Sequence, residues 1–191
     1  MRRVAGAIGC VVVAGGLAAV APAQAASPDV VISQVYGGGG STGAPYANDF
    51  VELFNRGPNA VSMTGWSVQY ASATGTGTFG SAIAPTVLAG TLQPGQHYLV
   101  QMASGGAVGA PLPTADAVGS VAMSATAGKV ALVTTTTALA CNGGSTPCTA
   151  GQLALIRDLV GYGSANFFEG PGPTGTLSNI TAALRGANGC T

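Results

Sequence analysis

The chain has 191 residues, which is enough for one domain with a core of ordinary size. Only 6% of the residues are charged and 31 are glycine, a composition that suits short strands and loops and disfavours long helices. Six basic residues balance six acidic ones, and the net charge becomes −2 once Arg2 and Arg3 are set aside. Such a faintly acidic surface has no electrostatic footprint for a phosphate backbone or an anionic lipid, so the composition disfavours direct nucleic-acid binding.

Residues 1–25 have the pattern of a secretory signal peptide. Arg2 and Arg3 form the charged start, an apolar run follows, and Ala23-Gln24-Ala25 matches a small-residue cleavage site. A transmembrane anchor fits less well, because the run is short, contains glycines and is followed by no basic stop-transfer flank. We therefore expect cleavage near Ala25 and a secreted, extracellular mature chain without a membrane span. Residues 26–191 are then one domain, with its core from about 30 to 185.

The first expected strand covers residues 30–36, which are rich in valine. Four glycines at 37–40 open the next loop, but without a lysine or a following helix they do not form a phosphate-binding loop. Asn48 and Asp49, where this loop ends, are the only calcium candidates, since oxygen ligands suit that ion. One carboxylate without a repeated acidic pattern is too small a ligand set, so we predict no metal site.

Residues 49–70 are the centre of the pattern and read as strand, tight turn and strand. Val51 and Leu53 share one face of the first strand, because successive strand side chains alternate. The segment 55–59 supplies glycine, proline and asparagine for the turn. Trp66, the only tryptophan, falls on the apolar face of the second strand. Its large ring predicts a core position, so Val51, Leu53 and Trp66 are the expected core anchors.

Short strands are expected to continue along the rest of the chain. Residues 86–92 and 97–102 are expected to pair around Pro94-Gly95, which fits a type II turn. No segment has a sustained helical period. Eight or nine short strands with turn residues between them predict an all-β fold, a β-sandwich. The remaining expected elements are strands over 120–123, 129–134 and 153–162, and a short element of uncertain type over 177–185.

Three cysteines remain once Cys10 leaves with the signal peptide. Cys141 and Cys148 flank six turn-forming residues, which can bring the two close enough for a disulfide in an oxidising compartment. We favour this pair among the three pairings that Cys190 also allows. A zinc site fits poorly, because there is no C-x-x-C spacing and no histidine nearby.

The residues that could carry chemistry are few. His97 is the only histidine, and we interpret it as a side chain on a half-exposed strand face. Asp49 and Glu52 are three apart on a strand and so face opposite ways, which spoils them as an acid and base pair. We predict no catalytic residues and no cofactor, and hence no enzyme. Four aromatic residues near loops are instead the candidate binding surface: Tyr36, Tyr46, Phe167 and Phe168.

Five segments, in this order, resemble the lamin-tail domain and in particular its bacterial secreted branch: 30–36, 49–55, 62–68, 92–96 and 158–163. The resemblance covers the chain from about residue 30 to 185. It implies an immunoglobulin-like β-sandwich, in agreement with the strand pattern. It also implies an accessory or interaction module with no catalytic motif, of a kind often joined to extracellular enzymes.

The leading hypothesis is therefore a secreted, non-catalytic interaction or targeting module whose partner is an unknown protein or a cell-surface ligand. A second hypothesis makes the chain the N-terminal accessory module of an extracellular nuclease or phosphodiesterase of the endonuclease/exonuclease/phosphatase type. The catalytic domain would then lie outside this chain. A third hypothesis is a structural protein of the cell surface.

Overall fold

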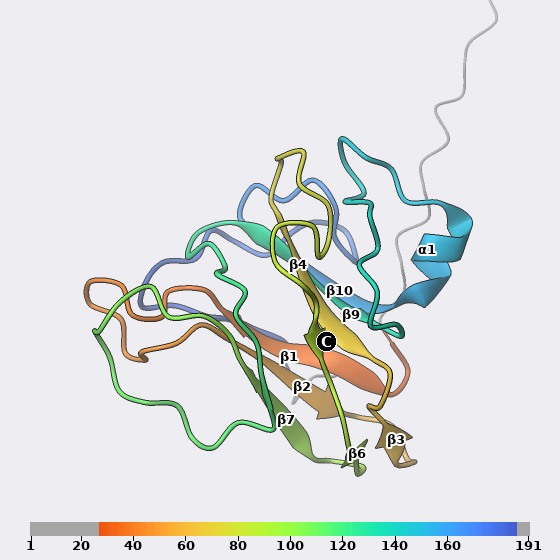
Figure 1. The fold of residues 1–191 in the computed structure, drawn as a ribbon, viewed down its shortest axis with the longest axis horizontal. Helices are drawn as coiled ribbons and strands as arrows, with labels where there is room; N and C mark the ends of the chain where they lie inside the picture. The colour runs from red at the N-terminus through yellow and green to blue at the C-terminus, as the bar shows by residue number, and fades with distance from the viewer. Residues whose placement is uncertain (1–26, 187–191) are drawn as a thin grey trace, which may run out of the picture.

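Short strands build two stacked sheets in this chain (Figure 1). The computed structural model describes residues 27–186, which contain eleven strands and one short helix. The expected signal peptide at 1–25, together with Cys10 and Cys190, lies outside the described residues. Over 27–186, no helix has the length and the apolar character needed to cross a membrane.

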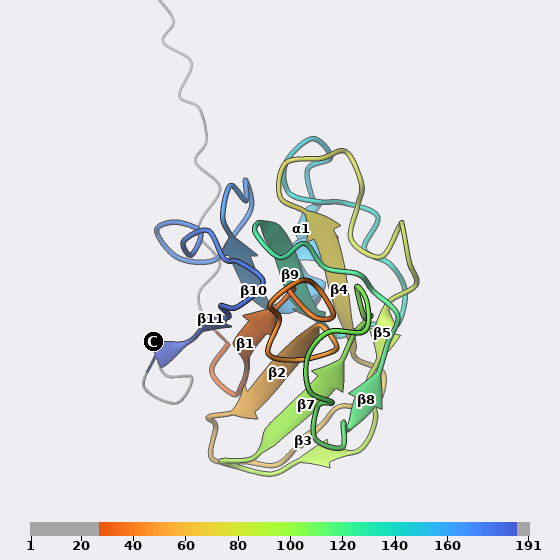
Figure 2. The ribbon, with the colours of Figure 1, turned by 90° about the vertical axis from the view of Figure 1, so that its left-hand side faces the viewer.

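The first sheet has the strand order β11-β1-β2-β7-β8, and its neighbours are antiparallel except for the parallel pair β7 and β8 (Figure 2). The second sheet has the order β10-β9-β4-β5 and is antiparallel. A small ribbon joins β3 to β6. The strands are β1 (Val30–Tyr36), β2 (Phe50–Asn55), β3 (Val61–Ser62), β4 (Ser67–Ser72), β5 (Thr86–Val87), β6 (Thr91–Leu92), β7 (His97–Gln101), β8 (Ala117–Val118), β9 (Gly128–Val133), β10 (Ile156–Tyr162) and β11 (Ala183–Leu184).

An apolar cluster holds the two sheets together. Val51 and Leu53 of β2 are fully buried in it, together with Val68 of β4 and Leu132 of β9. The all-β, immunoglobulin-like sandwich predicted from the sequence is thereby confirmed. Trp66 packs against the same cluster but is only partly buried, and it lies one residue before β4 begins. The tryptophan is therefore a peripheral anchor and not the central one expected.

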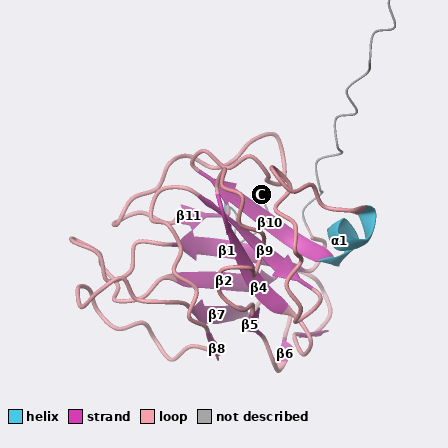
Figure 3. Ribbon diagram, turned by 45° about the horizontal axis from the view of Figure 1, so that its top comes forward, coloured by secondary structure: helices cyan, strands magenta, loops and turns pink. Residues whose placement is uncertain are grey.

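A second apolar cluster covers β9 on its other side. Ala131 and Val133 belong to this cluster, whereas Val130 and Leu132 belong to the first. All six residues of β9 are consequently buried. The cover comes from segments between the strands and from α1 (Ala150–Leu155), which lies at one end of the molecule (Figure 3). The helix begins at a capping box in which Thr149 and Gln152 satisfy each other's backbone N–H groups.

The strand pairing differs from the pairing expected from sequence. The two arms of the expected hairpin, β2 and β4, belong to different sheets, so the chain crosses from one sheet to the other after 55–59. Residues 86–92 do not pair with 97–102, because β5 pairs with β4, β6 pairs with β3, and β7 pairs with β2. No strand forms over 120–123, and the start of 153–162 is helical.

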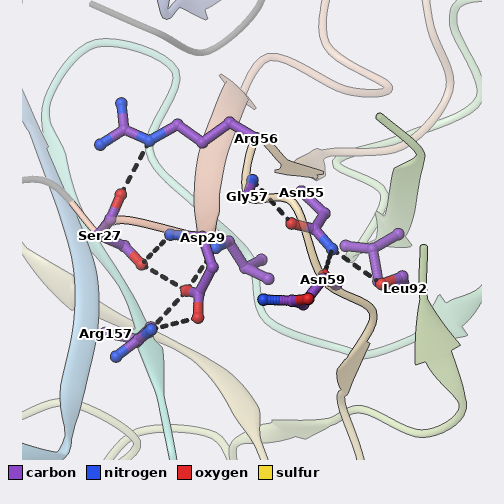
Figure 4. A network of polar contacts seen from close by, with 9 residues as sticks. Ser27, Asp29, Asn55, Arg56, Gly57, Asn59, Leu92 and Arg157 are labelled. Carbon is purple, nitrogen blue, oxygen red and sulfur yellow. Dashed lines mark hydrogen bonds and ion pairs between the residues drawn. The ribbon is translucent and has the colours of Figure 1, made fainter. Parts of the chain in front are cut away.

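The Asn55 side chain explains why 55–59 makes a crossover (Figure 4). Its Nδ2 donates to the carbonyls of Asn59 at 2.8 Å and Leu92 at 2.9 Å, and its Oδ1 accepts from Gly57 N at 3.0 Å. Asn55 is fully buried, so its amide replaces the backbone pairing that a hairpin would have provided. The Asn55 side chain thus adds three hydrogen bonds to the backbone bonds that Asn55 makes with Gly95 and Gln96.

β1 of the first sheet and β10 of the second lie side by side without pairing, and we call the line between them the seam. Each of these two strands contains a β-bulge. The register of β1 on β2 shifts between Ile32 and Gln34, and that of β10 on β9 shifts between Ile156 and Asp158. An extra residue in a bulge reorients the side chains after it. Ile32 and Val35 therefore both enter the core although they are three residues apart, which regular alternation would forbid.

Asp158 is the buried centre of this seam. Its Oδ2 accepts from Ile32 N at 2.7 Å, and both of its oxygens contact Arg185 Nη2, at 3.2 and 3.0 Å. Arg185 Nε in turn donates to the Ile32 carbonyl at 3.1 Å. A second pair, between Arg157 and Asp29, closes the same seam nearer the start of β1 (Figure 4). The seam is therefore held by polar side chains and not by a strand ladder.

Replacing Asp158 by asparagine should destabilise the fold by about 3–5 kcal/mol, because it removes one partner of a buried ion pair. Denaturant unfolding of the two proteins measures this difference. The control is Asp116→Asn, an exposed carboxylate that accepts one backbone bond from Leu99 N, and it should lose no more than about 1.5 kcal/mol. Equal losses in the two variants would contradict a special role for the seam.

A disulfide joins Cys141 to Cys148, whose Cα atoms lie 5.1 Å apart. Its loop covers the end of β9, where the fully buried Lys129 donates from Nζ to the Asn142 carbonyl at 2.8 Å and to Asn166 Oδ1 at 2.9 Å. Burial lowers the pKa of Lys129. The loop thus supplies one of the two acceptors that make this burial tolerable, and Asn166, after β10, supplies the other.

Replacing both Cys141 and Cys148 by serine should cost about 2–3 kcal/mol, since the crosslink restricts a short loop in the unfolded chain. The free energy of unfolding should be measured with and without a reductant. We expect the reductant to lower the value for the wild type to that of the double variant and to leave the variant unchanged. A wild type that does not respond to reductant would argue against the linkage.

Candidate functional site

The outer face of β1, β2 and β7 is the candidate site. Along β7 the burial alternates, so that Tyr98 and Val100 are buried while His97 is exposed and Leu99 is half-buried. The register sets Leu99 opposite Glu52, and Glu52 opposite Gln34. These side chains form a half-exposed row across the three strands, whereas the apolar clusters occupy the inner face and the far side of the second sheet.

A groove runs over this face. One hollow of about 370 Å³ lies above the row, between the ring of Tyr46 and the segment 112–116. A neighbouring hollow of about 470 Å³ shares two residues with it, His97 and Asp116. The second hollow is lined in part by Leu92 and Tyr98 of the first apolar cluster, so it lies past the edge of the outer face. The first hollow lies in the size range of ligand sites and combines apolar walls with a few polar groups, as such sites do.

Glu52 is the polar centre of the groove. Its Oε1 accepts from Ser33 Oγ at 2.7 Å and from Gln34 Nε2 at 3.2 Å, and it lies 3.0 Å from His97 Nδ1. The imidazole is also stacked on Phe54, with ring centroids 4.7 Å apart. Contacts between β1, β2 and β7 therefore fix the positions of the Glu52 carboxylate and the His97 imidazole.

The arrangement resembles a hydrolytic triad only in composition. In a working triad the histidine bridges the nucleophile and the carboxylate, so that it can take the proton of the hydroxyl group. Here the carboxylate of Glu52 lies between Ser33 and His97. The hydroxyl donates to the acid and not to the imidazole, so His97 is not placed to activate Ser33. The geometry favours binding over acyl transfer.

The four aromatic residues expected to form one binding surface lie in two places. Tyr36 is 2% exposed and donates its hydroxyl to the Asn179 carbonyl, so it does not line a surface. It packs with Tyr46 and Phe50, and of these three only Tyr46 is exposed, at 38%. Phe167 packs instead on Phe79 in the second cluster. The expected surface is therefore corrected to Tyr46 alone.

Phe168 follows Phe167 and is half-buried. A Cβ built on Gly161 would lie 2.7 Å from its Cβ, so the two residues approach closely. Phe168 thus sits against β10 and away from the ring cluster of Tyr46.

The side chains of Asn48 and Asp49, the calcium candidates, form hydrogen bonds with the backbone of this chain. Asp49 is buried, and its two oxygens accept from Gly39 N at 2.8 Å and Met123 N at 2.9 Å. Asn48 donates from Nδ2 to the Met102 carbonyl at 3.0 Å. Among the described residues, no three or more acidic, histidine or cysteine side chains gather as a metal site would require. Asn48 and Asp49 therefore fix loops, and we no longer regard them as ligands.

Several groove residues carried no signal that sequence reasoning could use. Asp116 and the segment 112–114 belong to a glycine-, proline- and alanine-rich crossover with no motif. Gln34 and Glu52 are on strands that were predicted, but they become neighbours only through the pairing of β1 with β2. The alternation of side chains along β2 predicts that Glu52 points outward. It does not predict which residues of β1 and β7 contact it.

The stability of the fold should depend on the protonation of Asp49. Burial raises the pKa of its carboxyl group from 3.8 to about 6, although two backbone N–H groups stabilise the ionised form. The folded chain therefore binds this proton more tightly than the unfolded chain does, and the resulting stability is complete below about pH 4 and lost as the pH rises through about 6.

The free energy of unfolding should be measured across this range for the wild type and for Asp49→Asn. We expect the wild type to lose stability as the pH rises through about 6, and we expect the variant not to show this loss. A carbon-13 titration of the Asp49 carboxyl group gives the pKa directly, and a midpoint below about 4 would contradict the burial argument.

Comparison with protein families identifies the chain. The model of the Lamin Tail Domain family matches residues 23–162, a span that contains every described strand from β1 to β10. No curated protein matches the chain. Because the matched span is most of the chain, the protein belongs to the Lamin Tail Domain family.

Proposed function

We propose that this chain is a secreted, non-catalytic binding module that holds a neutral, hydroxyl-rich polymer of the cell surface in the groove over β1, β2 and β7. The observation that carries the proposal is the groove itself. Its main hollow has a volume of about 370 Å³, it opens on the sheet face that the apolar clusters leave uncovered, and the exposed ring of Tyr46 lines its wall. A sugar chain offers both hydroxyl groups for the polar side chains and an apolar ring face for the tyrosine.

The charges in the groove support a neutral ligand. Glu52 and Asp116 are carboxylates, and the one basic side chain of the groove, His97, is already paired with Glu52. Two carboxylates repel a phosphate backbone, which needs cationic side chains to displace its counterions. Carboxylates and the Gln34 amide are, in contrast, suitable hydrogen-bond partners for hydroxyl groups.

A non-catalytic role is supported by the order of Ser33, Glu52 and His97, in which the acid separates the hydroxyl group from the imidazole. Secretion is supported by the signal-peptide pattern at 1–25. The disulfide adds to this support, because disulfides persist mainly in oxidising, extracellular compartments.

Sedimentation of the purified protein with insoluble polysaccharides and with purified cell-wall glycan tests the proposal. We expect saturable retention, and a Tyr46→Ala variant should bind about two- to twelvefold more weakly, since one ring contact contributes about 0.5–1.5 kcal/mol. The matched control is Ile83→Ala, because Ile83 is 37% exposed but lies between β4 and β5, away from the groove.

Binding should be nearly independent of salt. A cationic peptide ligand would instead lose affinity as salt is added, because surface charges are screened. Retention of no polysaccharide, or equal retention of the wild type and Tyr46→Ala, would overturn the proposal. Turnover of any of these polymers would overturn the non-catalytic part.

A further inference from the structure

The row of outward-facing side chains over β1, β2 and β7 continues onto β11. Leu99 of β7 lies opposite Glu52 of β2, which lies opposite Gln34 of β1. Gln34 in turn lies opposite Leu184 of β11. Side chains that lie directly opposite each other on neighbouring strands point to the same face of the sheet. Leu184 therefore stands on the same face as the groove, one strand beyond it.

Gln34 connects the groove to a hollow at the β11 edge of the sheet. It lines the hollow of about 370 Å³ above Glu52, and it also lines a hollow of about 150 Å³ that has Leu184 in its wall. The smaller hollow reaches the core residues Ile32 and Ala183, so it opens at the edge of the sheet, on the seam. The surface thus stays hollowed from Glu52 past Gln34 to Leu184.

Two oxygen atoms in the middle of the row are free to accept hydrogen bonds. Glu52 Oε1 makes the contacts with Ser33, Gln34 and His97, whereas Glu52 Oε2 makes none within residues 27–186. Gln34 donates from Nε2 to Glu52, and its Oε1 accepts no hydrogen bond in the same part of the chain. Neither oxygen is among the buried side-chain atoms of 27–186 that lack a partner, so both are exposed to solvent.

Leucine side chains stand at the two ends of the row. Leu184 is 69% exposed, and Leu99 is half-buried. The row therefore reads, from β7 to β11, as an apolar group, two acceptors and a second apolar group. Three strand spacings separate the two leucines, a distance of about 14 Å. One sugar unit is too short to span this distance, whereas a chain of several units spans it.

We propose that the glycan site extends over β1 to β11, so that the polymer crosses the strands, donates hydroxyl groups to Glu52 and Gln34 and lays a ring face on Leu184. The inference rests on the proposed function. It adds the direction of the bound chain, a minimum length of several sugar units, and a second apolar contact beside that of Tyr46.

An extended peptide suits this surface less well. Peptides that bind a sheet by strand addition use the unpaired backbone groups of an edge strand. β1 is paired on both sides, and β11 at the edge has only two residues. The row offers side-chain acceptors and hydrocarbon, which are the partners that the hydroxyl groups and ring faces of a sugar chain require.

The β11 end of this site lies outside the part of the chain that the family model matches. Leu99, Glu52 and Gln34 fall within residues 23–162, whereas Leu184 follows that span. The added contact therefore comes from the segment after β10, and it can be removed without changing the groove itself.

The length of the bound chain tests the proposal. The dimer and the hexamer of the polysaccharide that retains the protein in the sedimentation experiment are titrated into the wild type, as cellobiose and cellohexaose if that polymer is cellulose. We expect the hexamer to bind about tenfold more tightly than the dimer, because it makes one further hydrogen bond and one further apolar contact. Only the hexamer should shift the amide signals of Ala183 and Leu184.

Leu184→Ala should bind the hexamer about fivefold more weakly, because it removes part of the apolar surface that the chain covers. It should bind the dimer as the wild type does, since a dimer held at Tyr46 and Glu52 does not reach β11. The exposed position of Leu184 means that the variant should fold normally. Val118→Ala is the matched control and should change neither affinity, because Val118 is also 69% exposed on a two-residue edge strand, at the opposite side of the same sheet.

The outcomes separate this inference from the proposed function. If no polysaccharide retains the protein, both fail. If a polysaccharide is retained but Leu184→Ala binds the hexamer as well as the wild type does, the polymer does not reach β11, and only the present inference is overturned. Shifts by the hexamer that stay within β2 and β7 would show a chain lying along the strands, and this would also overturn it.

Discussion

The buried carboxylate of Asp158 is the contact on which the arrangement of the two sheets depends. Along the seam β1 and β10 share no ladder, and Asp158 takes the place of one by accepting the free Ile32 N–H and holding Arg185. The bulges in both strands are what turn these groups toward each other. If the carboxylate is lost, the Ile32 N–H and the Arg185 guanidinium group lose their common partner together. Asp158 thus links β1 to β10 and to Arg185 in the segment after β11.

The chain uses its few charges in the same way throughout. Only 6% of its residues are charged, and every described carboxylate has a specific contact with the chain. Asp49 ties two loops to β2, Glu52 gathers three side chains from neighbouring strands, and Asp29 holds Arg157 at the start of the seam. Several of these carboxylates accept hydrogen bonds from backbone N–H groups and so hold loops and strands in place. The groove owes its fixed shape to this use, since its polar side chains are already held by one another.

Sequence reasoning predicted the parts of the fold that depend on local pattern. β1 has the expected bounds, and Val51 and Leu53 are buried because alternation on a half-buried strand determines which way a side chain points. Strand partners were not predictable, because they depend on the crossover that Asn55 helps to hold, and a turn-forming segment reads the same in a hairpin and in a crossover. The candidate sites were missed for a related reason. Glu52 and His97, or Gln34 and Leu184, come from separate segments that only the sheet register brings together.

The brevity of the outer strands has a consequence for association between copies of the chain. The five-stranded sheet ends in β11 on one side and β8 on the other, each only two residues long, and β5 at one edge of the second sheet is equally short. The fourth edge, β10, is partly occupied by Thr174, which bonds to Gly161 and Gly163. A foreign strand that tried to extend either sheet would find almost no free ladder to join. Strand addition is the common route to amyloid-like aggregation, and short or covered edges are a recognised defence against it. For a chain with so little charge to keep its copies apart, this blunting of the sheet margins supplies a resistance to aggregation that its surface electrostatics provide only weakly.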